Sequence, residues 1–226
     1  MVQREAILKG NITGVFFRYV TPGVIGMVGM SLYILADTYF IANGVGRLGL
    51  AALNIGLPAY NLIFGIGALL GIGGGTVFSI LHGRGELGRA NRPFTISAVL
   101  GTAFSLLFAL LGLVAAEPIA FLLGATEETA LYTTTYLRVI LLFSPAFILN
   151  NIMTAFVRND GNPHLAMAAM TISTLTNIVL DYVCIYPLKL GMFGAALATG
   201  LGSVLGLLIQ LTHFSAQGQQ PALAAH

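Results

Sequence analysis

Six long apolar stretches occupy most of this chain, and few charged residues interrupt them. The composition is 57% hydrophobic and 8% charged, whereas soluble domains carry about 25% charged residues. At about 1.5 Å per residue, a helix of about 20 apolar residues crosses the ~30 Å hydrocarbon core of a membrane. We therefore predict an all-α integral membrane protein, a bundle of six transmembrane helices at residues 16–42, 50–81, 94–116, 131–157, 165–186 and 192–212.

Short polar or Gly- and Pro-rich segments join the stretches, so we expect one six-helix transmembrane unit over residues 1–214. The segment 215–226 is polar and rich in Gln and Ala, and we expect it to be disordered. A soluble bundle would need polar outer faces, which these stretches lack. Small residues at regular intervals would instead let membrane helices approach closely. They form two ridges: Gly67, Gly71 and Gly75 in one stretch, and Gly194, Ala198, Gly202 and Gly206 in another.

The distribution of basic residues predicts the orientation in the membrane. The first stretch is longer than a signal-peptide core and has no small-residue cleavage site, so we expect it to be retained as the first helix. Alternating crossings then place both termini and the loops 82–93 and 158–164 on one side. That side receives seven basic residues and the other receives three, which makes it cytoplasmic by the positive-inside bias. The seven are Arg4, Lys9, Arg18, Arg84, Arg89, Arg92 and Arg158; the three are Arg47, Arg138 and Lys189.

Two acidic residues, Asp37 and Asp181, lie inside predicted helices, whereas the other six fall in or beside loops. Ionisable groups within a membrane span are costly, so they normally face a cavity or a partner and mark a path for ions or substrates. A structural polar contact is the alternative. Both aspartates precede the outer end of an outward-running helix by six residues, which places both at a depth of ~9 Å.

Two further polar side chains reach the same depth. Asn177 precedes Asp181 by four residues and therefore lies on the same helix face, one turn deeper. Thr199 lies ~12 Å down the last helix, which runs back inward. Four oxygen-bearing side chains are thus expected to converge. Such a set suits Na⁺, a hard cation that prefers oxygen ligands. It equally suits a proton, because protonation relieves the repulsion between two neighbouring carboxylates. The sequence leaves the choice between Na⁺ and H⁺ open.

Other chemistries find no support in the sequence. The glycine-rich segment 71–76 lacks the lysine of a phosphate-binding loop and follows no strand. No serine-hydrolase or zinc-protease motif is present, and the single cysteine, Cys184, offers neither a disulfide nor a metal cluster. The scattered basic residues do not indicate nucleic-acid binding. We expect a protein that is not an enzyme and needs no cofactor beyond a coupling ion.

Several motifs in the chain resemble those of the multidrug and toxic compound extrusion (MATE) transporters, particularly bacterial and archaeal drug exporters. Residues 35–40 (LADTYF) and 50–52 (LAA) are similar to the first helix of that family and the start of its second. The loop segments 82–86 (HGRGE) and 158–163 (RNDGNP) resemble two of its cytoplasmic loops. The most specific match is Asn177-x-x-x-Asp181 followed by 187–191 (PLKLG) and 194–199 (GAALAT).

The resemblance implies a function and a set of site residues. It implies that Asp37, Asn177, Asp181 and Thr199 form a cation site, and that Pro22 corresponds to a proposed bending point of the first helix. A proline within a helix does permit a bend, because it removes a backbone hydrogen bond. The resemblance also implies export of amphipathic organic cations in exchange for Na⁺ or H⁺, from the plasma membrane of a bacterium or archaeon.

The resemblance covers nearly the whole chain but only half of a transporter of this kind, which has two six-helix lobes. Alternating access by rocking one bundle against another needs a second bundle. We therefore expect a half-transporter that works as a homodimer or with a separate second lobe. Two alternatives stay open: an inactive or non-transporting membrane fragment, and a flippase for lipid-linked precursors. No Arg or Lys is expected deep in a span, which disfavours the flippase, because related flippases have a basic cavity.

Overall fold

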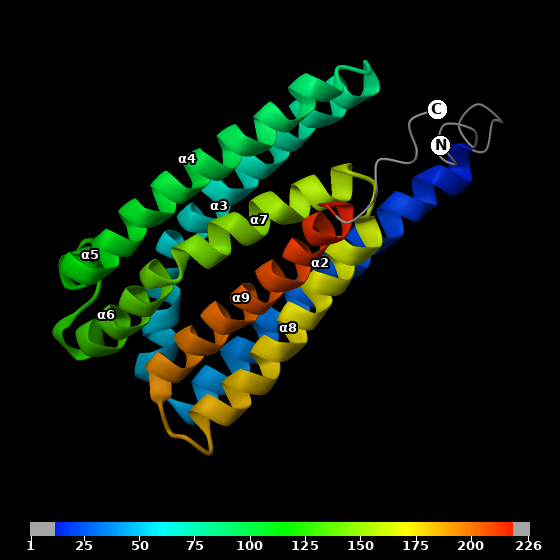
Figure 1. Ribbon diagram of the computed structural model, residues 1–226. Coiled ribbons are helices and arrows are strands. Elements are labelled where there is room, and N and C mark those ends of the chain that lie inside the picture. Colours follow the sequence, from blue (N-terminus) through cyan, green and yellow to red (C-terminus); the bar gives the residue numbers. More distant parts are fainter. Residues whose placement is uncertain (1–11, 219–226) are drawn as a thin grey trace.

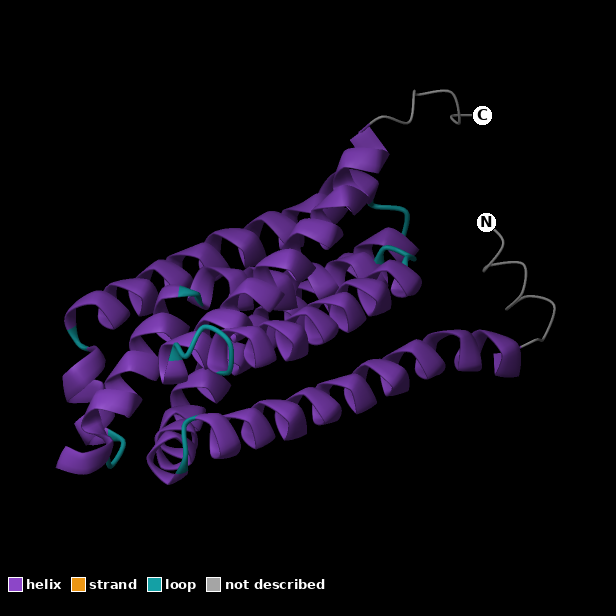
Figure 2. Cartoon of the chain, turned by 90° about the horizontal axis from the view of Figure 1, so that it is seen from below, coloured by secondary structure: helices purple, strands orange, loops and turns teal. Residues whose placement is uncertain are grey.

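A computed structural model describes residues 12–218 of the chain, and these residues form eight helices and no strand (Figures 1 and 2). The all-α membrane fold predicted from the sequence is confirmed. The helices are α2 (Ile12–Gly44), α3 (Arg47–Gly83), α4 (Leu87–Val114), α5 (Ala116–Leu122), α6 (Glu127–Leu142), α7 (Ser144–Asn159), α8 (Pro163–Ile185) and α9 (Gly191–Gly218).

Length and apolar composition mark most of these helices as membrane spans. Within residues 12–218, α3, α4, α8 and α9 are each long and apolar enough to cross, and α6 and α7 together make a fifth, bent span. The sequence predicts α2 as the remaining span, and its 33 residues suffice to cross the hydrocarbon core. Helix α9 continues to Gly218, so the first four residues of the segment 215–226 are helical; the last eight lie outside the described residues.

The long helices run the length of the bundle in alternating directions (Figure 1). The start of α2, the end of α9 and the loops α3–α4 and α7–α8 lie at one end, which we call the inner end. The loops α2–α3, α5–α6 and α8–α9 lie at the opposite, outer end. Helices α7 and α9 occupy the middle, since α7 packs against α3, α4, α8 and α9, and α9 also packs against α6 and α8. Helix α2 packs chiefly against α8.

The prediction of one continuous helix over residues 131–157 is wrong, because the chain bends by 49° between α6 and α7. Pro145 opens α7 and has no N–H to donate to the carbonyl oxygen of Leu141, one turn earlier. The hydroxyl of Ser144 instead donates to that oxygen at 2.6 Å. The bend is compatible with the membrane because this hydroxyl satisfies the freed carbonyl. The short helix α5 was also missed, since its seven residues are too few to show a helical period.

The two predicted glycine ridges are confirmed as sites of close helix packing. On α3, a Cβ atom at Gly67 would lie 3.1 Å from the Cα of Ile148, and one at Gly71 would lie 3.1 Å from the Cα of Ile152, both on α7. On α9, a Cβ atom at Gly202 would lie 2.9 Å from the carbonyl oxygen of Ser173 on α8. Backbones in such contact leave no room for a side chain. The contacts hold α3 against α7 and α9 against α8, beside the site described next.

Candidate cation site

Asp37 and Asp181 lie close together in the interior of the bundle. Asp37 belongs to α2 and Asp181 to α8, and their carboxyl groups are near enough to interact directly. Asp181 is 0% exposed and Asp37 is 6% exposed. Two carboxylates that are buried together repel each other and have both lost hydration, so their negative charges call for a positive ion or a proton.

A second layer of polar side chains lies one helical turn closer to the inner end. Tyr33 is four residues before Asp37 on α2, and Asn177 is four residues before Asp181 on α8. Between them, the Asn177 side-chain amide donates to the hydroxyl of Thr199 on α9 at 3.3 Å. The hydroxyl of Tyr33 interacts with Thr199 as well. The structure therefore brings Asp37, Asn177, Asp181 and Thr199 into two adjacent layers contributed by three helices.

The oxygen atoms of this cluster are available to a ligand. Four buried side-chain oxygens have no hydrogen-bond partner among the described residues: Oδ1 of Asp37, both carboxyl oxygens of Asp181, and Oδ1 of Asn177. A buried polar atom without a partner costs about 1–3 kcal/mol. A cation that accepts these oxygens as ligands would remove that cost, and a proton shared by the two carboxyl groups would remove part of it. The donor set contains oxygen alone, which suits Na⁺ or H⁺ and not a softer metal.

Three tyrosines surround the aspartates, and the sequence analysis missed them. Tyr33, Tyr60 on α3 and Tyr136 on α6 all lie near enough to Asp37 to interact with it electrostatically. Only Tyr33 carried a sequence signal, its four-residue spacing from Asp37. The other two come from distant parts of the chain. Their phenol groups add polar atoms beside the carboxyl pair.

A cavity of about 120 Å³ opens beside the second layer. Tyr33, Asn177 and Thr199 belong to its lining, together with Asn150 and Asn151 on α7. The two asparagines thus line a cavity. No Arg or Lys lines this cavity.

Two residues named in the sequence analysis, Pro22 and Arg138, and the polar residue Asn54 on α3 do not belong to the cluster. Pro22 is within α2, but its side chain lies outside the described residues, so its role as a hinge stays a prediction. Asn54 is exposed, and its amide donates to the carbonyl oxygen of Leu50. Arg138 lies in α6; its side chain is exposed and does not line the cavity.

A comparison with protein families identifies the group to which this lobe is related. The MatE family is matched by residues 22–183, which include both aspartates and Asn177. The chain belongs to the MATE family. The resemblance seen in the sequence motifs is therefore confirmed.

Individual MATE relatives agree with this assignment. The chain is 32% identical over 216 residues to the multidrug export protein MepA of Staphylococcus saprophyticus, covering 94% of this chain and 46% of that protein. It is 31% identical over 206 residues to MepA of Staphylococcus aureus strain MRSA252, covering 91% and 46%. The chain thus spans about half the length of these curated relatives.

Solved MATE structures share the fold. An outward-facing multidrug resistance MATE family transporter superposes with a TM-score of 0.83 at 29% identity, covering 89% of this chain and 45% of that one. A MOP superfamily transporter from Pyrococcus furiosus, described as having a binding pocket of reverse polarity, gives a TM-score of 0.83 at 29% identity and covers 89% and 44%. This chain is a multi-pass membrane protein with the fold of one MATE lobe.

Proposed function

We propose that this chain is the cation-binding lobe of a multidrug antiporter that exports amphipathic organic cations in exchange for Na⁺ or H⁺. The observation that carries the proposal is the pair of buried carboxyl groups, Asp37 and Asp181, whose oxygens lack hydrogen-bond partners inside a MATE lobe. The relatives named multidrug export proteins support the class of transported compound.

The exchange follows from the charge of this site. When a cation or proton is bound between Asp37 and Asp181, their repulsion is relieved, and α2 and α8 can pack closely. When it leaves, two negative charges remain in a poorly hydrated interior. A ligand shifts a conformational equilibrium only by its difference in affinity for the two states. Binding at the junction of α2 and α8 provides such a difference, since a movement of α2 relative to α8 changes the distance between the two carboxyl groups. Pro22 is the proposed bending point for that movement.

The second half of the transporter is a separate requirement of the proposal. Exchange across the membrane needs a second six-helix bundle against which this lobe can rock. That bundle is either a second copy of this chain or a separate second lobe. We place the inner end on the cytoplasmic side of the plasma membrane, because the segments that the sequence predicts on that side carry seven of the ten basic residues.

The cavity lining favours this function over transport of lipid-linked precursors. Such precursors carry phosphate groups, which Arg and Lys bind. Asparagine, threonine, serine and tyrosine line this cavity, and no basic side chain does. Polar and aromatic walls suit an organic cation, which aromatic faces attract.

A transport assay tests the proposal. The chain is reconstituted in liposomes alone and with the C-terminal lobe of a MATE relative, and ethidium, a fluorescent organic cation, is followed. We expect ethidium movement that requires both lobes and an opposing gradient of Na⁺ or H⁺. Movement that ignores both gradients would contradict cation coupling. Equal movement by the chain with and without the added lobe, at a protein density that keeps it monomeric, would contradict the need for a second bundle.

A further inference from the structure

Three hydroxyl groups in the cavity lining have already donated their hydrogens to the backbone. Thr154 on α7 and Thr199 on α9 donate to backbone oxygens one turn earlier on their own helices, at 2.7 and 3.1 Å. Ser173 on α8 donates to the backbone oxygen of Gly202 on α9 at 2.7 Å. A hydroxyl has a single hydrogen, so each of these three groups can meet a ligand in the cavity only as an acceptor.

Two asparagines of the lining leave an oxygen without a partner. The amide nitrogen of Asn177 on α8 donates to the hydroxyl of Thr199, and Oδ1 of Asn177 is buried with no hydrogen-bond partner in residues 12–218. The amide nitrogen of Asn151 on α7 donates to the backbone oxygen of Phe147 at 3.0 Å. Its Oδ1 accepts no hydrogen bond from another described residue. Both oxygens therefore remain to accept a hydrogen bond from a ligand.

Asn150 on α7 is the exception in this lining. Its Oδ1 accepts a hydrogen bond from Nε2 of Gln210 on α9 at 2.8 Å, so its amide nitrogen is the end left for a ligand. The hydroxyls of Thr174 and Ser203 can turn to donate or to accept, and they favour neither kind of ligand group. Three hydroxyl oxygens and two amide oxygens are thus left to accept, against one amide group left to donate.

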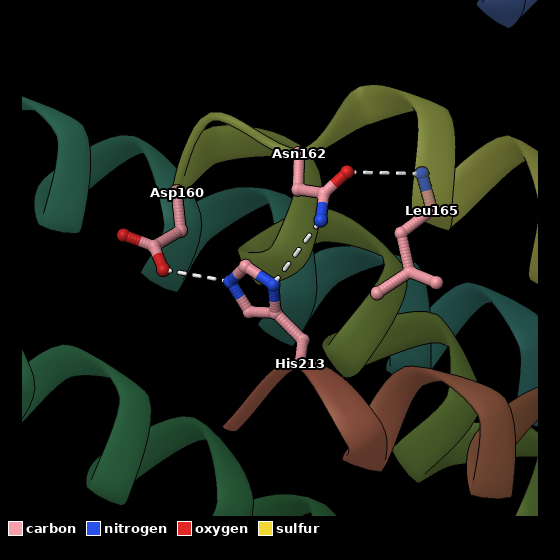
Figure 3. Close-up of polar contacts among 4 residues, drawn as sticks. All are labelled: Asp160, Asn162, Leu165 and His213. Carbon is pink, nitrogen blue, oxygen red and sulfur yellow. Dashed lines mark hydrogen bonds and ion pairs between the residues drawn. The ribbon is translucent and has the colours of Figure 1, made fainter. Parts of the chain in front are cut away.

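An asparagine outside the cavity shows the contrast. At the inner end, Oδ1 of Asn162 accepts a hydrogen bond from the backbone N–H of Leu165 at 3.1 Å, and its Nδ2 contacts Nδ1 of His213 at 3.4 Å (Figure 3). The other ring nitrogen of His213 contacts Asp160 at 2.8 Å. Both ends of the Asn162 amide are therefore used within the protein, as is usual for polar groups that are largely buried. The asparagines of the cavity each keep one end for a ligand or for water.

Charge and aromatic rings draw cations of every kind to this cavity. The carboxyl pair lies one turn beyond Asn177 but does not belong to the lining, so it attracts a ligand in the cavity through charge alone. Tyr60, Phe64 and Phe147 add aromatic rings to the wall, and aromatic faces attract cations. The acceptor oxygens are the feature that distinguishes ligands. A cation with N–H groups satisfies them, whereas one without N–H groups displaces their water and leaves them unpaired.

We propose that this cavity is a receptor for cations that carry N–H groups, and that it binds ammonium, amidinium and guanidinium groups in preference to quaternary ammonium or phosphonium groups of equal charge. Ammonium and guanidinium groups donate hydrogen bonds and accept none. Hydrogen bonds from charged donors are stronger than those between neutral groups. A site built to receive N–H groups also rejects an analogue without them. The inference rests on the proposed function only in taking an organic cation as the ligand.

Two probes of equal charge and similar size test the preference. Benzamidinium has an aromatic ring and donates through the N–H groups of its amidinium. N-propylpyridinium has an aromatic ring, the same charge and the same number of non-hydrogen atoms, but no N–H group. Isothermal titration calorimetry on the purified full-length chain measures both affinities. We expect benzamidinium to bind at least about tenfold more tightly, the factor that corresponds to one hydrogen bond from a charged donor.

A double variant that removes acceptors separates hydrogen bonding from shape. Ser173→Ala with Thr154→Val should lower the affinity for benzamidinium by about tenfold and leave that for N-propylpyridinium unchanged. The matched control is Ser97→Ala with Thr76→Val. Ser97 on α4 also donates to a neighbouring helix, to the backbone oxygen of Leu70 at 3.0 Å, and Thr76 on α3 also donates one turn back, at 2.7 Å. Neither residue lines the cavity, so the control should leave both affinities unchanged.

The outcomes that would overturn the proposal are distinct from those that would overturn cation coupling. Equal affinities of the unchanged chain for the two probes, or no binding of either, would overturn the preference. An equal loss for both probes in the double variant, shown to be folded by gel filtration, would also overturn it. The titration needs neither an ion gradient nor a second lobe. A failure of cation-coupled export would therefore appear in the ethidium assay and leave this preference as predicted.

Discussion

Replacing Asp181 with Asn should reduce gradient-driven ethidium export by the two-lobe transporter to background, and replacing Asp37 with Asn should do the same. Either substitution keeps the shape of the side chain but removes one of the two negative charges that a cation neutralises. With one charge gone, ion binding no longer distinguishes the conformations, and a gradient cannot drive exchange. Initial export rates in proteoliposomes, normalised to the amount of inserted protein, measure the effect.

The control for this experiment is an acid that lies outside the site. Glu128, in the first turn of α6, is exposed, and Glu128→Gln removes the same charge from the surface. We expect export by Glu128→Gln to match that of the unchanged protein. Membrane insertion should be equal in all three variants, since replacing a buried charged group with a neutral amide does not add to the cost of insertion. Export that persists in Asp181→Asn would remove Asp181 from the coupling mechanism.

Replacing Gly71 with Leu should lower the free energy of unfolding of the lobe by about 1–3 kcal/mol, the usual cost of overpacking a close contact. Even a Cβ atom at this position would lie 3.0 Å from the backbone oxygen of Asn151 and 3.1 Å from the Cα of Ile152. Backbone atoms cannot move aside as a flexible side chain can, so α3 and α7 must separate. Thermal denaturation in detergent, followed by the loss of the monodisperse gel-filtration peak, measures the change.

Gly73 supplies the matched control on the same helix. A Cβ atom at Gly73 meets nothing within 4 Å, and the residue is exposed on the surface of the bundle. Gly73→Leu should therefore leave the melting temperature unchanged or raise it slightly, because glycine is a poor helix former. Equal melting temperatures for the two variants would show that α3 and α7 are not in close backbone contact.

The fold was largely predictable because the membrane constrains it so strongly. Every backbone group in a span must be satisfied internally, so an apolar stretch of sufficient length becomes a helix. The break before Pro145 was not visible in this pattern, since residues 131–157 remain apolar on both sides of it. The break depends on a local exchange of hydrogen-bond donors, in which the Ser144 hydroxyl takes the place of the N–H that Pro145 lacks. This exchange leaves the average hydropathy of the segment unchanged.

The candidate site was only partly predictable, because helix packing brings some of its residues together from distant parts of the chain. Asp37 and Asp181 stood out because charge inside a span is rare, and helix geometry placed Asn177 and Thr199 beside them. Tyr60 and Tyr136 carry no such signal, because a tyrosine in a span is common enough to pass unnoticed. Their positions beside the aspartates depend on how α3 and α6 pack, which a single sequence does not specify.

Carbodiimide labelling tests most directly whether Asp37 and Asp181 share one ion. Dicyclohexylcarbodiimide modifies protonated carboxyl groups in apolar surroundings, and mass spectrometry of the purified chain quantifies the modification of each aspartate across a range of Na⁺ concentration and pH. We predict that the Na⁺ or pH dependence at Asp37 changes when Asp181 is replaced by Asn, and that the dependence at Asp181 changes reciprocally in Asp37→Asn. Identical titration curves at each aspartate with and without its neighbour would contradict a shared cation site.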